Sequence, residues 1–305
     1  MHGVVIRAHG LWYEVRVRDN STVYIATIRG NLKQQSRRTD IVAVGDQVWI
    51  TDAGEGEAVI EAVEPRRSVF SRTARNTRDT EQVILANPDQ VVLMFAARDP
   101  EPHLRMLDRF IILAERQDLP VRIVVSKLDL ERDLSVDDPL GPATDRFRIY
   151  ECLYPVHYIS AVTGAGIDEL EKELRGRISV IAGPSGVGKS SLLNVLDPDW
   201  KRETGVVSTA TGKGKHTTTG AQLYEIGDGT FIADTPGMRS LAMHAIPDDQ
   251  LDWYFREFRP FIDDCRFRGC AHDHEPGCAV LEAVQRGDIA EERYQSYLMV
   301  RSSSS

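Results

Sequence analysis

A glycine-rich octapeptide in the middle of the chain has the residue types that bind phosphate. It reads Gly183-Pro184-Ser185-Gly186-Val187-Gly188-Lys189-Ser190 and matches the pattern G-x-x-x-x-G-K-[ST] at every fixed position. Glycines let the backbone turn tightly and approach a phosphate without a Cβ in the way, while N–H groups at the start of the next helix face the anion. We expect Lys189 to reach the β- and γ-phosphates and Ser190 to ligate Mg²⁺, with Ser191 beside it. The alternative is a glycine-rich turn that binds nothing.

A second turn, Asp234-Thr235-Pro236-Gly237, follows a predicted strand at 230–233. It stands where a phosphate-loop hydrolase places its second Mg²⁺ group. Asp234 would hold the metal through water, and the Gly237 N–H would sense the γ-phosphate. Asp-x-x-Gly alone is a weak signal, but downstream of a phosphate loop and after a strand it becomes strong.

A third stretch, Ser126-Lys127-Leu128-Asp129, resembles the [NT]KxD motif with which GTPases recognise guanine. The Asp129 carboxylate can accept hydrogen bonds from guanine N1–H and the exocyclic amine. Because adenine offers neither donor, the unpaired carboxylate would reject ATP. The Lys127 stem can lie over the base, whereas Ser126 stands where Asn or Thr is usual, a departure that concerns the bracing of the loop. Ser160-Ala161 resembles the short motif whose alanine N–H meets guanine O6.

The order of these motifs is a circular permutation. Ordinary GTPases run from phosphate loop through switch I and DxxG to [NT]KxD and SA, whereas this chain begins with [NT]KxD and SA and ends with DxxG. The permutation is physically permitted because every motif stays on a loop at the carboxyl end of its strand. Termini that lie close together in space can also be rejoined.

Three cysteines and a histidine are clustered near the C-terminus with the spacing Cys265-x4-Cys270-x-His272-x5-Cys278. Three thiolates and one imidazole make a tetrahedral zinc set with no open position, which is structural rather than catalytic. His274 competes with His272 for the fourth place. The alternative is three cysteines buried together by coincidence. The remaining cysteine, Cys152, stands alone and is expected to be a small buried hydrophobe.

The elements that would position these motifs alternate between strand and helix from Gln82 onward, which predicts a parallel sheet covered on both faces. Residues 90–97 form a near-continuous apolar run, as a strand buried on both faces requires. Strands are predicted at 90–97, 121–125, 178–181 and 230–233, and helices at 104–114, 168–174 and 191–196.

The N-terminal 64 residues have a different pattern, with short apolar alternations broken by turns. Strands are predicted at 4–6, 11–15, 23–26, 48–50 and 58–60. Five short strands in so few residues indicate a small barrel, with an OB-fold as the leading candidate. A basic loop lies between two of the strands and is either an RNA-backbone contact or a solvated loop; its residues are Arg29, Lys33, Arg37 and Arg38.

Residues 65–82 are predicted to be a basic linker, because five arginines and no acid occur over 65–78. That composition favours a phosphate or RNA contact over a neutral spacer. The predicted domains are therefore an OB-fold barrel at 1–64, this linker, an α/β phosphate-loop GTPase domain at 83–244 and a helical zinc-binding domain at 245–305. In the last domain one helix is predicted to carry Trp253, Tyr254, Phe258 and Phe261, and another to carry Leu281, Val284 and Ile289.

Composition excludes several classes of protein. Hydrophobic content of 42% and charged content of 27% are ordinary for a globular chain with a proper core. The net charge of −9 does not indicate a general nucleic-acid binder. No apolar run is long enough to span a bilayer, and the N-terminus lacks the apolar region of a signal peptide. We therefore expect a cytoplasmic protein without a disulfide framework.

The combination of motifs and their order resembles the RsgA family of bacterial circularly permuted GTPases, which depend on the small ribosomal subunit. The resemblance covers nearly the whole chain and is carried by the phosphate loop, the permuted motif order and the Cys/His cluster. It implies GTP hydrolysis to GDP, stimulation by the 30S subunit, contact with 16S rRNA and a role in late 30S maturation. It also implies one structural Zn²⁺, Mg²⁺ bound with GTP, and no membrane contact; nothing demands a dimer. The family spacing favours His272 over His274.

The same resemblance makes residues 211–219 switch I, with a threonine that meets Mg²⁺ and the γ-phosphate. We assign Thr218, with its neighbours as alternatives. Ras-like enzymes keep a water-orienting Gln where this chain has Met238, and a thioether cannot orient that water. We therefore hypothesise that a partner positions His216 near the nucleophile; the alternative is that His216 contacts RNA or packs locally. Met238 also leaves open an RNA-binding module that uses GTP only as a stabilising ligand.

Overall fold

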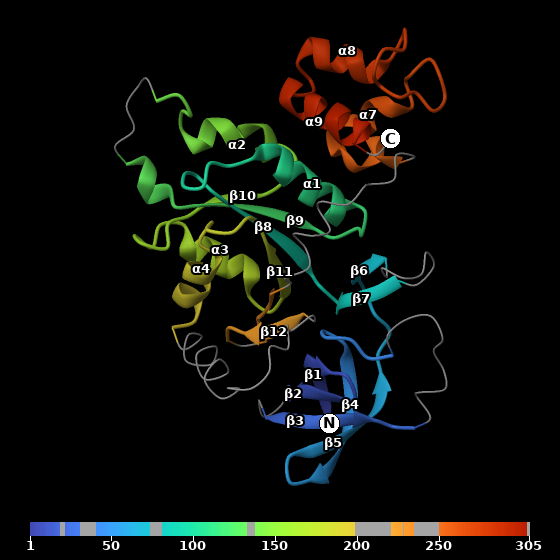
Figure 1. Ribbon diagram of the computed structural model, residues 1–305, viewed down its shortest axis with the longest axis vertical. Coiled ribbons are helices and arrows are strands. Elements are labelled where there is room, and N and C mark those ends of the chain that lie inside the picture. Colours follow the sequence, from blue (N-terminus) through green and yellow to red (C-terminus); the bar gives the residue numbers. More distant parts are fainter. Residues whose placement is uncertain are drawn as a thin grey trace.

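The computed structural model describes residues 1–18, 22–30, 41–73, 81–132, 138–198, 221–227, 229–234 and 250–303. Three units follow one another along the long axis of the molecule (Figure 1): an N-terminal barrel, a central sheet flanked by helices and a C-terminal helical unit. The motifs at 211–219 and 235–240 and most of the basic N-terminal loop lie outside the described residues.

The N-terminal unit is a closed five-stranded barrel with strand order β1-β2-β3-β5-β4, so the predicted OB-like barrel is confirmed. Every neighbouring pair is antiparallel except β3 and β5, which run parallel. Alternate residues such as Val15, Ala26 and Ile60 fill the barrel interior and are fully buried. The strands are β1 (His2–His9), β2 (Trp12–Val17), β3 (Val23–Ile28), β4 (Gln47–Gly54) and β5 (Glu57–Val63).

The predicted linker contains a strand and part of another. β6 (Val69–Thr73) pairs antiparallel with β7 (Glu81–Ala86) and joins the barrel to the central sheet. The junction is tight, because a Cβ on Gly45 would lie 2.0 Å from the Ala86 carbonyl oxygen. Arg66 does not face solvent as a free cation: its guanidinium pairs at 2.8 Å with Asp46, whose side chain is fully buried. This arginine therefore fixes the junction instead of offering a phosphate contact.

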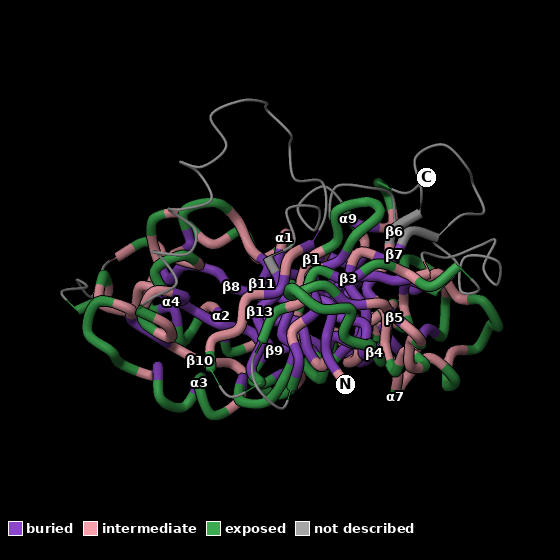
Figure 2. Tube along the Cα trace, turned by 90° about the horizontal axis from the view of Figure 1, so that it is seen from below, coloured by how far each residue is buried: buried purple, intermediate pink, exposed green. Residues whose placement is uncertain are grey.

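Among the described residues, the central sheet has six strands in the order β10-β9-β8-β11-β13-β12, and β12 alone is antiparallel to its neighbour. Its middle strands are buried along their whole length (Figure 2). The strands are β8 (Gln90–Ala96), β9 (Val121–Ser126), β10 (Val156–Tyr158), β11 (Ile178–Ala182), β12 (Gln222–Glu225) and β13 (Phe231–Asp234). The predicted α/β sheet is confirmed, and β10 and β12 are additions that the apolar pattern did not indicate.

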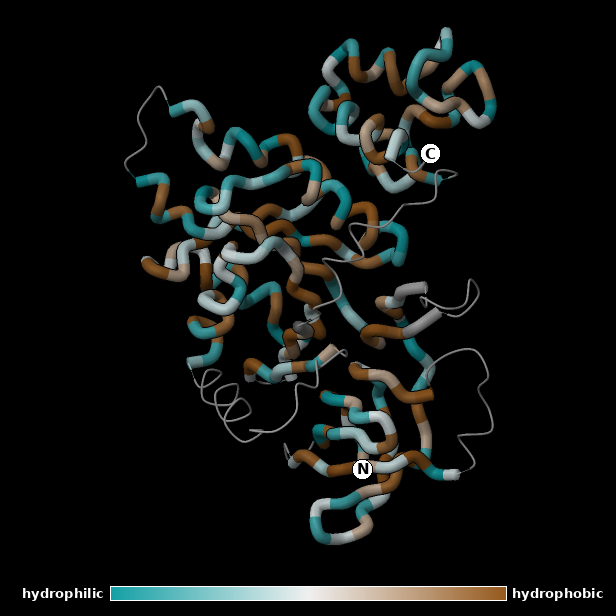
Figure 3. The backbone as a smooth tube through the Cα atoms, in the orientation of Figure 1, coloured by the Kyte–Doolittle hydropathy of each residue, from teal (hydrophilic) through white to brown (hydrophobic). Residues whose placement is uncertain are grey.

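Helices cover both faces of the sheet because successive residues of a strand point to opposite sides. Val91, Leu93 and Phe95 pack with α1 (Leu104–Glu115) and α2 (Ala143–Glu151). Val92 and Met94 pack with α3 (Ile167–Leu174) and α4 (Lys189–Leu196) on the other face. Hydrophobic residues, coloured brown in Figure 3, accordingly recur along the strands of the sheet and of the barrel. Strands buried on both faces explain why 90–97 reads as a continuous apolar run.

The C-terminal unit differs from its prediction in one helix. The residues expected on one helical face are spread over three short turns, because Pro260 lacks an N–H and its ring would clash with the carbonyl of residue 256 in a continuous helix. The turns are η4 (Asp252–Tyr254), η5 (Arg256–Phe258) and α7 (Arg259–Ile262), followed by α8 (Ala279–Arg286) and α9 (Glu291–Ser302). Ile289 lies beyond the end of α8, where Gly287 adopts φ 81°, but joins the same core.

Arg293 of α9 ties the C-terminal unit to the central one. Its side chain is only 1% exposed and donates to Asp108 of α1 and, at 2.6 Å, to Glu257. Tyr150 of α2 also donates to Asp108, at 2.7 Å. Burial of the arginine is thus compensated by two carboxylates, one from each unit.

We expect the variant Arg293→Met to unfold more easily by roughly 3–5 kcal/mol, because it leaves two carboxylates buried without their cation. The free energy of unfolding from a urea titration measures this loss. Arg286→Met is the matched control, since Arg286 is about half exposed and pairs on the surface with Asp288; its effect should stay within about 0.5 kcal/mol. Equal losses in the two variants would contradict the buried-pair interpretation.

Candidate nucleotide-binding and metal-binding sites

The phosphate loop leaves the carboxyl end of β11 and enters α4. Gly183 has φ 152°, and a Cβ there would lie 2.0 Å from the Met94 carbonyl oxygen of β8. Gly188, with φ 92°, is the residue before the first turn of α4, which begins at Lys189. Both glycines are therefore required by the path of the backbone, and the first N–H groups of α4 point toward the loop.

The Lys189 ammonium lies across this loop. Its Nζ is 2.9 Å from the Gly183 carbonyl oxygen and 2.7 Å from that of Pro184. The carbonyl oxygens of the loop therefore hold the ammonium group beside the loop, where it could donate to the oxygens of a bound phosphate instead. This placement fits the predicted role of Lys189 with the β- and γ-phosphates.

Ser126 links the predicted guanine loop to the phosphate loop. It is the last residue of β9, is 3% exposed, and donates from its hydroxyl to the Val187 carbonyl oxygen at 2.6 Å. The Phe95 carbonyl oxygen lies 3.2 Å from the same hydroxyl. Bracing of the loop is thus present although Ser replaces the usual Asn or Thr, because the shorter side chain still reaches the adjacent backbone.

Asp129 lies on η2 (Leu128–Glu131) at the carboxyl end of β9. Ser160, which follows β10, donates to Asp129 Oδ1 at 2.5 Å and accepts from the Val162 and Thr163 N–H groups at 3.2 Å. Among the described residues no donor is assigned to the other carboxylate oxygen. Ser160 therefore orients the carboxylate, and Ala161 follows it directly in the same turn.

Asp234 ends β13 opposite Ile181, two residues before Gly183. Its backbone thus lies beside the entrance to the phosphate loop, at the same sheet edge as Asp129; nothing is described of its side chain. Ser190 and Ser191 lie in the first turn of α4. Three other predicted nucleotide-site residues, His216, Thr218 and Gly237, fall outside the described part of the chain.

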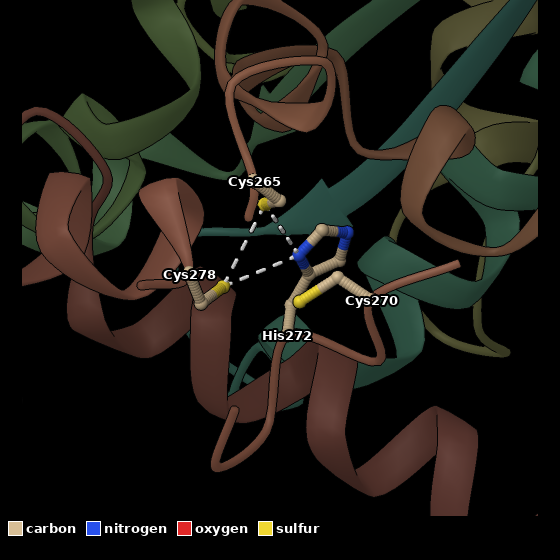
Figure 4. Close-up of side chains that lie close together, drawn as sticks. All are labelled: Cys265, Cys270, His272 and Cys278. Carbon is tan, nitrogen blue, oxygen red and sulfur yellow. Dashed lines mark hydrogen bonds between the residues drawn. The ribbon is translucent and has the colours of Figure 1, made fainter. Parts of the chain in front are cut away.

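The four predicted metal ligands converge in the C-terminal unit (Figure 4), and their ligand atoms all lie within 4.8 Å of one another. The Cys265 and Cys278 sulfurs are 3.9 Å apart, and His272 Nδ1 is 3.6 and 3.4 Å from them. Tetrahedral Zn–S bonds of about 2.3 Å place sulfurs ~3.8 Å apart, so this set has the size of a zinc site. His272 is buried and His274 is 84% exposed, which settles the choice between them.

Burial raises the pKa of the Cys270 thiol to about 12 and also raises that of Cys278. In the metal-free protein these two thiols keep their protons at neutral pH, so a bound metal has to displace them. The fourth cysteine of the chain, Cys152, is exposed at the end of α2, so its predicted burial is wrong.

A comparison with models of known protein families gives a match over the central part of the chain. The family model described as RsgA GTPase matches residues 63–244, more than half of the chain. This chain belongs to the RsgA GTPase family. It is therefore a GTP-hydrolysing enzyme, and the recognition made from motif order is confirmed.

Similar proteins match this RsgA-family GTPase over nearly its full length. A relative from Gemmatimonas aurantiaca, called small ribosomal subunit biogenesis GTPase RsgA, is 43% identical over 98% of this chain and 96% of its own. One of the same name from Chlorobaculum tepidum is 40% identical over equal shares, 98% and 96%. Crystal structures of YjeQ from Thermotoga maritima and of YloQ, a circularly permuted GTPase, superimpose with TM-scores of 0.80 and 0.75. Their identities are 35% and 28%; the first covers 99% of this chain and 98% of its own, the second 99% and 94%.

One site residue of this RsgA-family GTPase was not found from the sequence. Asp252 accepts from His272 Nε2 at 3.2 Å, so the ring presents Nδ1 to the cysteines. Burial alone would raise the pKa of Asp252, but hydrogen bonds from His272 and the Trp253 N–H lower it. A carboxylate behind a ligating histidine fixes its tautomer and orientation. No sequence signal indicates this partner, because it lies 20 positions from the histidine.

The basic N-terminal loop of this RsgA-family GTPase is described only at its start. Arg29 follows β3, pairs with Glu61 and remains 60% exposed. Lys33, Arg37 and Arg38 lie outside the described residues, so contact with RNA stays a prediction for all four.

The longest helices described, α1 and α9, have 12 residues each, well short of a bilayer crossing.

Proposed function

We propose that this RsgA-family enzyme hydrolyses GTP under stimulation by the small ribosomal subunit and acts in late 30S maturation. The relatives named for small ribosomal subunit biogenesis support this role. The observation that carries the guanine assignment is the Ser126 hydrogen bond, which joins the Asp129 loop to the phosphate loop at one sheet edge. One edge thus offers a base contact and a triphosphate contact.

The residues of this edge would divide the work by chemistry. Asp129 accepts from guanine while Ser160 and Ala161 complete the base pocket, and Gly183 to Ser191 hold the phosphates. Water attacks the γ-phosphorus and its bond to the β–γ bridging oxygen breaks, so the negative charge that gathers on GDP lies near the Lys189 ammonium. Mg²⁺ would be held by Ser190, Thr218 and Asp234 and would neutralise phosphate charge.

Two further contacts are proposed: a structural metal ion in the C-terminal unit and RNA at the N-terminal barrel. Zn²⁺ held by Cys265, Cys270, His272 and Cys278 would stabilise the C-terminal unit, since the donor set fits a closed tetrahedral site. Contact with 16S rRNA through Arg29, Lys33, Arg37 and Arg38 is supported by their charge and by their position in the sequence between strands β3 and β4 of the OB-like barrel. A cytoplasmic monomer is the form in which we expect the protein to act.

Phosphate release under multiple turnover, with and without purified 30S subunits, tests this function. Release from GTP should rise on adding 30S subunits, and ATP should not substitute. His216→Ala should lower the stimulated rate by about 100-fold or more while GTP affinity is kept, as expected for loss of a proton-transferring group.

Two variants calibrate that assay. Lys189→Ala should lose both intrinsic and stimulated release, whereas His274→Ala replaces an exposed histidine and should match the wild type. An unchanged stimulated rate in His216→Ala would reject the role of that histidine. Absence of 30S stimulation in the wild type would reject the coupling to the ribosome.

A further inference from the structure

The loop after β8 lies between the two nucleotide motifs. The Asp99 carbonyl oxygen accepts from the Lys127 ammonium of the guanine loop. On the other side, Pro100 Cδ lies 3.7 Å from the position that a Cβ on Gly186 would take. This loop therefore bonds to the base loop and lies close to Gly186 of the phosphate loop.

Arg98 anchors this loop. Its guanidinium donates to both carboxylate oxygens of Asp138, at 2.9 and 3.1 Å, and to the Gly141 carbonyl oxygen at 3.0 Å. Its Nε lies 3.4 Å from Glu131 Oε1, and the side chain is 17% exposed. A planar guanidinium with several fixed partners holds its neighbours in one geometry.

Glu131 is the point at which this network reaches the base loop. It ends η2, two positions after Asp129, and is 8% exposed. Its carboxylate accepts from the Ala143 N–H at 2.9 Å, which caps the start of α2, and from Arg146 at 2.9 Å. Arg146 in turn donates to the Ala97 carbonyl oxygen at 2.8 Å. The carboxylate thus connects η2, α2 and the end of β8.

The base loop needs such an anchor because it is short and partly strained. η2 has four residues, and Lys127 before it adopts φ 59°, a left-handed conformation that a lysine rarely takes. On the nucleotide side η2 is held by the Leu128 N–H bond to Ile159 and by the Ser160 bond to Asp129. At its other end η2 is held by the contacts of Glu131 with the Ala143 N–H and Arg146.

We propose that Glu131, held by Arg98 and Arg146, is a positioning residue for guanine selectivity. It keeps η2 at the distance from β10 at which Asp129 can bond both donors of guanine. This inference rests on the proposed assignment of Asp129 as the guanine acceptor. It predicts a larger effect on the base than on the phosphates, because the backbone of the phosphate loop is also fixed at Gly183, which packs against Met94 of β8 and not against η2.

Glu131→Gln is the test, because it keeps the shape of the side chain and removes its charge. The KM for GTP should rise roughly 10-fold to 100-fold, the range for a lost charge-assisted hydrogen bond, while kcat at saturating GTP stays close to wild type. The affinity ratio of GTP to inosine triphosphate, which lacks the exocyclic amine, should fall toward one. Glu171→Gln makes the same change in an exposed ion pair on α3 and should alter neither value.

If Glu131→Gln weakens GTP and inosine triphosphate equally, or leaves both unchanged, the positioning role is wrong. If Glu131→Gln fails to fold, Glu131→Asp keeps the charge on a shorter stem, and its GTP to inosine triphosphate ratio is decisive in the same way. Asp129→Asn run in parallel separates the two claims: a variant that still prefers guanine removes the base assignment itself.

Discussion

Asp129→Asn is expected to reverse the base preference of this enzyme from guanosine to xanthosine triphosphate. Xanthine keeps N1–H but has a carbonyl in place of the exocyclic amine. An asparagine amide can accept from N1–H and donate to that carbonyl, whereas with guanine it meets a donor with a donor. Because a site built to hydrogen-bond its substrate strongly rejects a mismatched analogue, GTP affinity should fall about 10³-fold or more.

The structure makes this substitution conservative in shape. Ser160 donates to Asp129 Oδ1 and can still donate to an asparagine oxygen, so the side chain should keep its orientation. Competition of the two triphosphates against a fluorescent GTP analogue measures the ratio. Asp118→Asn is a matched control: Asp118 is exposed beyond the end of α1 with φ 52°, a conformation that asparagine tolerates. An unaltered ratio in Asp129→Asn would assign guanine recognition elsewhere.

Removal of Cys278, one of the four proposed metal ligands, is expected to unfold the C-terminal unit. Cys278 is 2% exposed, lies among the other ligands and also accepts the Leu281 N–H at the start of α8. Structural zinc sites contribute roughly 10–16 kcal/mol in small units, far more than a single packing contact. Cys278→Ala should lose one zinc per chain, as measured by metal analysis, and residues 250–303 should become sensitive to protease.

The nucleotide site provides an internal control for that variant. GTP affinity should be retained, because the phosphate loop and η2 make no contact with the metal ligands among the interactions described. Cys152→Ser, at an exposed cysteine, should keep both metal and protease resistance. Full zinc content in Cys278→Ala, or an unchanged protease pattern without zinc, would show that the cluster is not a structural metal site.

Much of the fold could be predicted because its signals are local. A strand buried on both faces, such as 90–97, requires a continuous apolar run, and a barrel strand requires alternation. β10 and β12 have three and four residues and are not predicted from the sequence, because such short strands have too few positions to show an apolar pattern. The prediction of one continuous helix over 253–261 is wrong because it followed the apolar spacing and not Pro260, which interrupts a helix and is visible in the sequence.

The sequence by itself determined which chemistry to expect of this protein: it contains the phosphate-loop pattern, the carboxylate predicted to bind guanine, the predicted set of metal ligands and the permuted order of the motifs. These features are recognisable because each motif is a short contiguous stretch whose residue types are dictated by what it binds.

Only the tertiary structure decided which side chains support those motifs. It showed that Ser126 braces the base loop, that His272 and not His274 faces the cysteines, and that Arg66 is committed to Asp46. It also joined Asp108 to Arg293 across 185 positions and Glu131 to Arg98 across the sheet edge. Partners this distant are selected by packing, and packing leaves no fixed spacing along the chain.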